Sequence, residues 1–183
     1  MMSSFRKCLA FSRSKQVTRL VRLALRQKFL TMSRIEPSTP EEDRKGVDFW
    51  VVLRDGTRIG IDVKAQRNYV GWLALETWSS VEKSVVGWTL REDVLTEYVL
   101  WVWPSKRRFA LVPFRPLRTV FREFGRDWYV NHPVSRQFTQ ADWKRKRPSY
   151  HSEIVLVPFH TVAGAMRELR LINTEPDTLQ SLA

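Results

Sequence analysis

The sequence predicts one α/β domain in which helices flank a mixed β-sheet. Three observations predict this class. Two stretches of alternating apolar and polar residues, 47–53 and 58–66, lie close enough in the chain to form a β-hairpin. Apolar residues recur at helical spacing between about 15 and 30. The pattern Leu-Val-Pro-Phe occurs at 111–114 and again at 156–159, and a helical stretch follows each copy, so two strand-to-helix units end the domain.

In the first half of the chain, each element follows from one local pattern. Val17, Leu20, Val21, Ala24 and Leu25 share one side of the expected N-terminal helix. The polar stretch that follows ends at Gly46, so the first strand of the domain is expected to begin at residue 47. A third strand is expected over 70–77 because that stretch is mostly apolar.

In the second half, residues 91–97 are expected to form a short helix, and 98–103 a buried strand that Pro104 ends. Residues 109–112 should pair with that strand across a basic turn. The last expected elements are a helix over 117–124, a strand over 156–159 and a helix over 162–171. The chain thus divides into a basic segment 1–34, a folded domain 35–172 and a loose tail 173–183 without periodicity.

Charge and composition narrow the range of partners. The chain has 31 Lys and Arg residues against 19 acidic ones, a net charge of +12, which favours a polyanionic partner such as nucleic acid. An anionic membrane surface is the competing partner and rests only on the basic N-terminal segment, but no apolar run approaches the roughly 20 residues that span a bilayer, so no membrane partner is expected. A lone cysteine, Cys8, excludes an intramolecular disulfide and a cysteine-rich zinc module. The three histidines lack ligand spacing, so metal binding by them is not expected.

The N-terminal segment is basic and contains no acidic residue before Glu36. Three interpretations stay open. Its helix could pack on the domain and present Arg22 and Arg26 to DNA, it could be a solvated arm, or the segment could be an organellar transit peptide. Apart from that last alternative, a cytoplasmic location is expected, at the nucleoid or in a phage-infected cell.

The acid-x-Lys pattern occurs three times, and context selects one of them. Asp43 with Lys45 lies in a polar approach to the first strand, and Asp142 with Lys144 begins a basic run, so solvated ion pairs explain both. Asp62 with Lys64 is the pair that sits inside a predicted strand.

Alternation along the predicted hairpin separates two sets of side chains. The odd positions are all apolar and should share the buried face: Val47, Phe49, Val51, Leu53, Ile59, Ile61, Val63 and Ala65. The opposite face then carries Asp48, Asp62, Lys64 and Gln66. We expect a register with Asp48 opposite Lys64 and Trp50 opposite Asp62, closed by a three-residue loop 55–57 or a bulge, in which Gly56 or Gly60 supplies the unusual backbone conformation.

Two carboxylates and an ammonium group on one sheet face suit phosphodiester hydrolysis. Asp48 and Asp62, joined by the backbone carbonyl of Val63, offer oxygen ligands for Mg²⁺ or Mn²⁺, which would polarise a phosphate and acidify a bound water. Lys64 would orient that water and offset charge on the phosphoryl oxygens. The alternative is an exposed Asp–Lys cross-strand pair worth about 0.2–1 kcal/mol.

Gly46-Val47-Asp48, the hairpin and Ile61-Asp62-Val63-Lys64 resemble the signature of the PD-(D/E)xK nuclease superfamily, over about residues 15 to 115. This superfamily includes type II restriction enzymes, archaeal-type Holliday junction resolvases and phage exonucleases. The resemblance implies a restriction-endonuclease-like αβββαβ core, metal ligands at Asp48 and Asp62, and a catalytic lysine at Lys64. The later Gly87-Trp88, followed by an aromatic strand, is also similar to members of this superfamily.

The sequence departs from the superfamily at two points. Val47 stands where the motif has proline, and no acidic residue lies on the first helix, so Glu41, Glu42 or Glu76 would have to supply a further carboxylate. Glu76 could equally be a solvated strand end. Gln66 could touch a ligand or phosphate, or be only a polar strand end.

Other basic residues are candidates for contacts with phosphates. They are Lys106 and Arg107 in the turn before residue 109, and the run Lys144, Arg145, Lys146 and Arg147. Each group has an ordinary alternative, a hairpin tip or a solvated loop. Five tryptophans, Trp72, Trp78, Trp88, Trp101 and Trp103, are expected to pack in the core and at its rim.

The sequence therefore predicts a metal-dependent hydrolase of DNA, branched DNA included, that acts as an endonuclease or junction resolvase. A resolvase would require a homodimer with two sites. The rival hypothesis is a non-catalytic nucleic-acid-binding protein that retains the fold.

Overall fold

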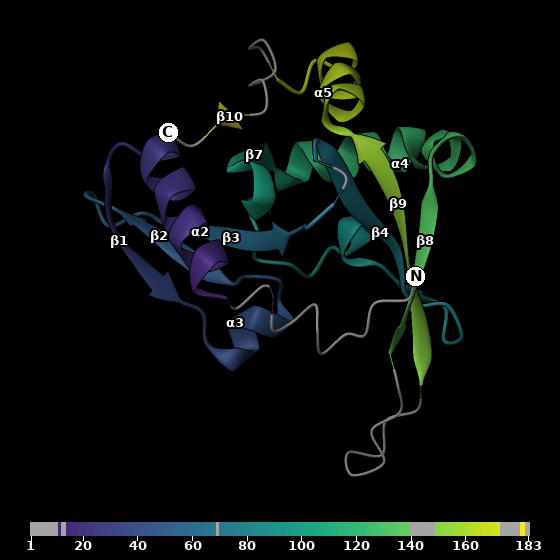
Figure 1. Ribbon diagram of the computed structural model, residues 1–183, viewed down its shortest axis with the longest axis horizontal. Coiled ribbons are helices and arrows are strands. Elements are labelled where there is room, and N and C mark those ends of the chain that lie inside the picture. Colours follow the sequence, from purple (N-terminus) through teal and green to yellow (C-terminus); the bar gives the residue numbers. More distant parts are fainter. Residues whose placement is uncertain (1–10, 12–13, 69, 140–148, 173–179, 182–183) are drawn as a thin grey trace.

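The computed structural model describes residues 11, 14–68, 70–139, 149–172 and 180–181 (Figure 1). Within them the α/β class is confirmed, because helices flank a mixed sheet and a second, antiparallel sheet stands beside it. The first sheet has the strand order β1 (Met32–Pro37), β2 (Phe49–Leu53), β3 (Arg58–Ala65), β6 (Tyr98–Trp103), β7 (Arg108–Pro113) and β10 (Gln180–Ser181). The second has the order β5 (Val85–Val86), β4 (Trp72–Ser80), β9 (Tyr150–Pro158) and β8 (Val134–Thr139).

The helices among these residues are α2 (Lys15–Lys28), α3 (Pro40–Arg44), α4 (Phe114–Asn131) and α5 (Phe159–Glu168), with short 3₁₀ turns η1 (Trp88–Leu90) and η2 (Pro104–Lys106). The predicted helix at about 15–30 is confirmed. Its first turn is capped by Ser14, whose hydroxyl oxygen accepts a hydrogen bond from the Val17 N–H. The predicted apolar side of this helix is buried.

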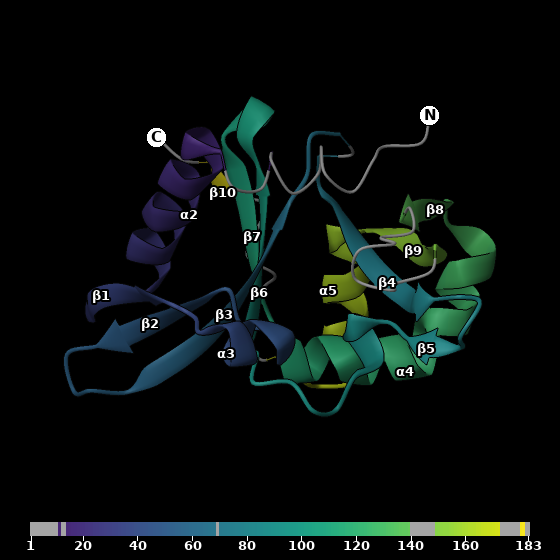
Figure 2. The ribbon, with the colours of Figure 1, turned by 90° about the horizontal axis from the view of Figure 1, so that it is seen from below.

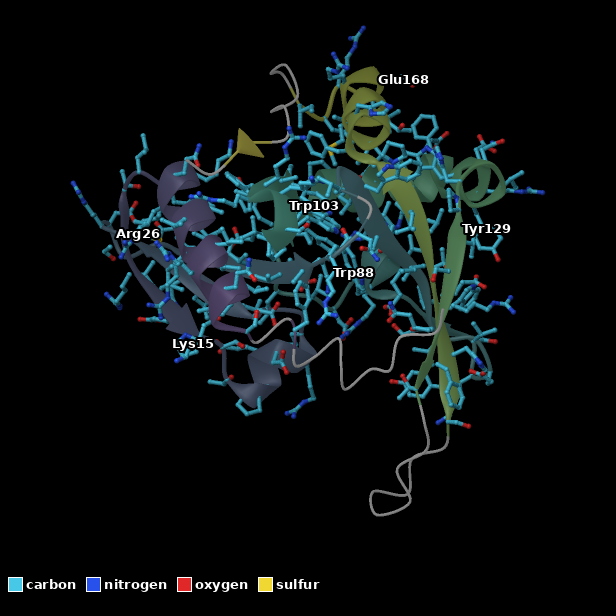
Figure 3. All side chains as sticks on the ribbon, viewed as in Figure 1. Lys15, Arg26, Trp88, Trp103, Tyr129 and Glu168 are labelled. Atoms are coloured by element: carbon cyan, nitrogen blue, oxygen red, sulfur yellow. The ribbon has the colours of Figure 1, made fainter. Side chains whose placement is uncertain are left out.

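Two apolar cores occupy the two faces of the first sheet. On one face, α2 packs through Val21 and Leu25 against Ile61 of β3 and Leu100 of β6. On the other face, the first sheet, the second sheet, α4 and α5 enclose a core that contains Trp101 (Figure 2). Figure 3 labels Trp88 and Trp103 near the centre of the molecule and Arg26 on α2 at its periphery. The catalytic candidates of β3 therefore lie on the sheet face opposite α2.

The hairpin of β2 and β3 forms as predicted, but in a different register. Phe49 pairs with Ile61 and Val51 with Ile59, a register shifted by two residues from the predicted one, and the pairing ends at Phe49, so Asp48 does not pair with Lys64. The predicted assignment of odd and even residues to opposite faces survives within β2 and β3, because the shift is an even number of residues. It is wrong for Val47, which precedes β2 and whose Cγ2 would lie 3.1 Å from a Cβ at the even position Gly60. The loop is 54–56, since the Leu53 N–H donates to the Thr57 carbonyl. Gly56, one of the two glycines expected to supply the unusual backbone conformation, has a φ of +87°.

The chain between β3 and β6 differs from the expected order. β3 and β6 are parallel neighbours, but β4 leaves the first sheet and pairs along its length with β9. The helix predicted over 91–97 is wrong. Backbone N–H groups there bond to other segments, since Leu95 donates to the Lys45 carbonyl and Glu97 to the Gly60 carbonyl, both at 2.9 Å.

At the C-terminus, residues 180–181 pair with β7, so this part of the predicted loose tail joins the first sheet. Residues 173–179 and 182–183 of that tail lie outside the described residues. Among the residues that the structure describes, no helix is long and apolar enough to cross a membrane.

Candidate active site

Asp48 and Asp62 face each other where β2 begins. Asp48 immediately precedes β2, and its N–H bonds at 2.9 Å to the carbonyl of Ile61, which is already the partner of Phe49, as at a β-bulge. The Asp48 Oδ2 accepts a hydrogen bond from the Val63 N–H at 2.7 Å. This bond holds the Asp48 carboxylate against β3 beside Asp62, which is only 6% exposed. The hairpin thus brings together the two carboxylates that the sequence predicted as metal ligands.

The proximity of two carboxylates raises the pKa of Asp48. Burial and the negative charge of Asp62 move this pKa from the ordinary 3.8 to about 7, although the Val63 N–H and Lys64 act in the opposite direction. Asp48 is therefore only partly ionised near neutral pH. A divalent cation between them would remove the same repulsion.

Lys64 extends from β3 beside this pair. Its Nζ lies 2.8 Å from the Asp62 Oδ2 and 4.7 Å from the centre of the Trp88 ring. Burial alone would lower the pKa of Lys64, but the charges of Asp62, Asp48 and Glu76 outweigh it and raise this pKa above its usual value. Lys64 is therefore a cation at neutral pH, with 29% of its side chain exposed.

Glu76 of β4 approaches the same place from the second sheet. Its Oε2 accepts hydrogen bonds from the Trp88 N–H at 2.9 Å and from the Ser79 hydroxyl at 2.7 Å. Trp88 thus connects Glu76 to Lys64, because its backbone N–H donates to Glu76 and its ring contacts the Lys64 amine. This position is compatible with the predicted role of Glu76 as a further acid near the site.

Gly87 makes this connection sterically feasible. A Cβ at Gly87 would lie 2.2 Å from the backbone carbonyl oxygen of Glu76, which is far inside van der Waals contact. We expect Gly87→Ala to lower the free energy of unfolding by about 1–3 kcal/mol, because the backbone of η1 would have to move. Thermal unfolding followed by circular dichroism measures this change.

Gly164→Ala in α5 is the matched control, because nothing lies within 4 Å of its added Cβ. Alanine is also the better helix former, so this variant should unfold at the same temperature or higher. Equal melting temperatures for Gly87→Ala and wild type would show that η1 does not need this close approach.

Gln66 follows Lys64 on the same face of β3. Its Oε1 is buried and has no hydrogen-bond partner among the described residues. A buried acceptor without a partner is costly unless water or a ligand satisfies it. Gln66 thus stays a candidate for contact with a bound molecule.

The predicted basic residues do not gather at the carboxylates. Arg22 and Arg26 are exposed on α2, across the first sheet from Asp62. Lys106 and Arg107 lie in the turn between β6 and β7, where Ser105 donates to the Arg67 carbonyl, close to the end of β3. Lys144, Arg145, Lys146 and Arg147 lie outside the described residues.

The donor set fits a hard cation with few protein ligands. Among the residues described, no group of three or more acidic, cysteine or histidine side chains is arranged to hold a metal. Asp48 and Asp62 supply two carboxylates, and the carbonyl of Val63 points to the same strand edge as the N–H that binds Asp48. Mg²⁺ is commonly held by one or two carboxylates, with water and substrate phosphate completing the octahedron.

Sequence reasoning missed two parts of this site. It identified Gly87-Trp88 only as similar to members of the superfamily, whereas the Trp88 ring contacts Lys64 and the Trp88 backbone N–H donates to Glu76. It also missed the Val63 N–H as the group that holds Asp48. The glycine before Trp88 was the available signal for the first, and no pattern in the chain indicated the second.

Comparison of the chain with models of protein families, with curated proteins and with solved structures finds no match.

Proposed function

We propose that this protein is a metal-dependent nuclease that hydrolyses DNA phosphodiester bonds at Asp48, Asp62 and Lys64. One observation carries the proposal: the carboxylates of Asp48 and Asp62 lie close together, with a lysine that is held as a cation beside them. A hairpin with a purely structural role gains little from this arrangement, because the repulsion between Asp48 and Asp62 destabilises the ionised form.

Asp48, Asp62 and the Val63 carbonyl would hold Mg²⁺ or Mn²⁺, which when bound polarises the scissile phosphate and acidifies an attacking water. Lys64 donates hydrogen bonds from its ammonium group to a phosphoryl oxygen or to that water. Because its pKa is raised, Lys64 stabilises negative charge and does not act as the base. Glu76 fixes Trp88, and Trp88 limits the positions that the Lys64 amine can take.

The strand order supports the restriction-endonuclease-like core in part. β1, β2 and β3 form an antiparallel meander after α2, and β6 is parallel to β3, as the αβββαβ order requires. The crossover from β3 to β6 passes through β4, β5 and η1, where that order has a helix. We therefore propose a member of the PD-(D/E)xK superfamily with an altered crossover, acting in the cytoplasm.

The test is cleavage of supercoiled, linear, branched and single-stranded DNA, with Mg²⁺, with Mn²⁺ and with EDTA. The proposal expects metal-dependent products from at least one of these substrates. Preferential cutting of four-way junctions by a dimer would identify a resolvase. Metal-independent cutting, or no cutting by protein that binds DNA, would favour the non-catalytic alternative.

DNA binding should weaken steeply with salt and depend little on sequence. The excess of 31 basic over 19 acidic residues implies that binding releases counterions from several phosphates. Binding measured by fluorescence anisotropy in EDTA should therefore show an affinity that falls on the order of 10³-fold between 50 and 200 mM salt if about six phosphates are contacted. Salt-independent binding would mean that the positive charge serves another purpose.

A further inference from the structure

A polar cavity lies on the second sheet, beside the candidate active site. It has a volume of about 200 Å³, and its lining includes Glu76 and Ser79 of β4, Gln137 and Phe138 of β8, and Tyr150 and Ser152 of β9. Neither the metal ligands nor Lys64 belongs to it. The proposed hydrolysis does not account for this combination of a tyrosine ring, hydroxyls and a carboxamide.

Strand pairing explains how these side chains meet. Glu76 and Ser135 both pair with Ile154, and Gln137 pairs with Ser152, so these positions share one face of the second sheet. The other face carries Leu75 and Val155, which are fully buried in the core. One face of this sheet is therefore apolar and packed, whereas the other presents hydrogen-bonding groups around the cavity.

Glu76 joins the cavity to the candidate active site. It lines the cavity, and its negative charge also helps to raise the pKa of Lys64. A strand whose phosphate lies at Lys64 would thus have its neighbouring nucleotide within reach of the cavity. Glu76 is thus the residue that the two sites have in common.

We propose that this cavity receives an unpaired nucleobase of the DNA strand bound at the active site. The inference rests on the proposed function and names its substrate class: single strands, flaps or branch points with an unstacked base next to the scissile phosphate. The ring of Tyr150 offers a stacking surface, and the Gln137 carboxamide can both donate to and accept from a base edge. The Phe138 ring packs against His151, with which Phe138 pairs, on the other face of the sheet.

The size of the cavity supports a single base. A volume of about 200 Å³ leaves room for one planar ring system. A paired base would first have to be flipped out of its stack, at a cost of a few kcal/mol. The cavity therefore favours DNA in which that base is already unpaired.

The experiment measures binding in EDTA, so that it does not depend on cleavage. The probe is 2-aminopurine in a DNA duplex, placed either at one unpaired position or in the same position fully paired. Wild type should bind the unpaired form more tightly and change its 2-aminopurine fluorescence, because the base enters a new environment. Tyr150→Ala and Gln137→Ala should each reduce that preference, and the loss for Tyr150→Ala should be roughly 5- to 150-fold, the equivalent of ~1–3 kcal/mol of base–aromatic stacking.

Ser135→Ala is the matched control, because Ser135 lies two residues from Gln137 on the same sheet face but does not line the cavity. It should retain the wild-type preference. Thermal unfolding shows that each variant is folded before it is compared.

Two outcomes overturn the inference: wild type that binds paired and unpaired probes equally, or Tyr150→Ala and Gln137→Ala variants that keep the full preference. Either result leaves the proposed function standing if wild type cuts DNA with Mg²⁺. Conversely, wild type could prefer the unpaired probe, and the variants lose that preference, although wild type cuts no DNA. This result would support base binding in the cavity and contradict the proposed hydrolysis.

Discussion

Asp62→Asn should lower the rate of magnesium-dependent DNA cleavage on the order of 10³-fold or more, while DNA binding in EDTA stays close to that of wild type. The substitution removes a charged metal ligand and keeps the size of the side chain. Lys64 keeps a nearby anion, since Asp48 also attracts its charge. Folding should therefore survive, as circular dichroism can show.

Lys64→Ala should lower cleavage as well, but for a different reason. It removes the cation that stabilises charge in the transition state and leaves both carboxylates in place. Calorimetric titration with Mn²⁺ should therefore show that affinity falls more for Asp62→Asn than for Lys64→Ala. Without metal, Lys64→Ala should also be less stable than wild type, because Asp48 and Asp62 then repel each other without a neighbouring cation.

Asp43→Asn is the control for both variants, since Asp43 is an exposed member of another acid-x-Lys pattern. It should cleave DNA and bind Mn²⁺ like wild type. Equal cleavage by wild type, Asp62→Asn and Lys64→Ala would show that the activity is a contaminant or lies elsewhere in the chain.

Asp48→Asn should abolish cleavage and yet stabilise the metal-free protein at alkaline pH. The folded-state pKa of Asp48 is raised from 3.8 to about 7, so its contribution to stability is fully present below pH 3.8 and is lost as the pH rises through 7. Between pH 5 and 8 the wild type should lose roughly 2–3 kcal/mol that the variant retains. Asparagine can still accept from the Val63 N–H and donate to Asp62.

The measurement is the difference in melting temperature between Asp48→Asn and wild type in EDTA, at pH 5 and at pH 8. From pH 5 to pH 8, the melting temperature of Asp48→Asn relative to that of wild type should rise by on the order of 5–10 °C. Other shifted carboxylates, such as Glu82 and Asp93, are present in both proteins, and their effects cancel in the difference. A difference that does not change with pH would mean that the pKa of Asp48 is not raised in the folded protein.

Local patterns were sufficient to predict the hairpin, the strand 98–103 and the assignment of Asp62 and Lys64 to one face. Side-chain alternation fixes which face a residue occupies, and this does not depend on the exact register. The register itself depends on the turn, where Gly56 permits a loop over 54–56 that begins one residue earlier than expected. That shift removed the predicted pairing of Asp48 with Lys64.

The remaining differences come from long-range pairing. β1 is an edge strand with exposed Ser33 and Arg34, so it lacks the apolar alternation that identifies a strand. β4 pairs with β9, far away in the chain, and no local pattern announces that partner. α3, in contrast, had a usable signal, because Thr39 and Glu42 form a capping box with Pro40 between them.

The most direct test of the central claim is to measure Mn²⁺ binding and DNA cleavage on the same preparations of wild type, Asp43→Asn and Asp62→Asn. We expect wild type and Asp43→Asn to bind one Mn²⁺ and to cut DNA in its presence, and Asp62→Asn to do neither while still binding DNA in EDTA. Folded wild type that binds DNA but neither binds Mn²⁺ nor cuts any of the four DNA forms would contradict the assignment of Asp48, Asp62 and Lys64 as a catalytic centre.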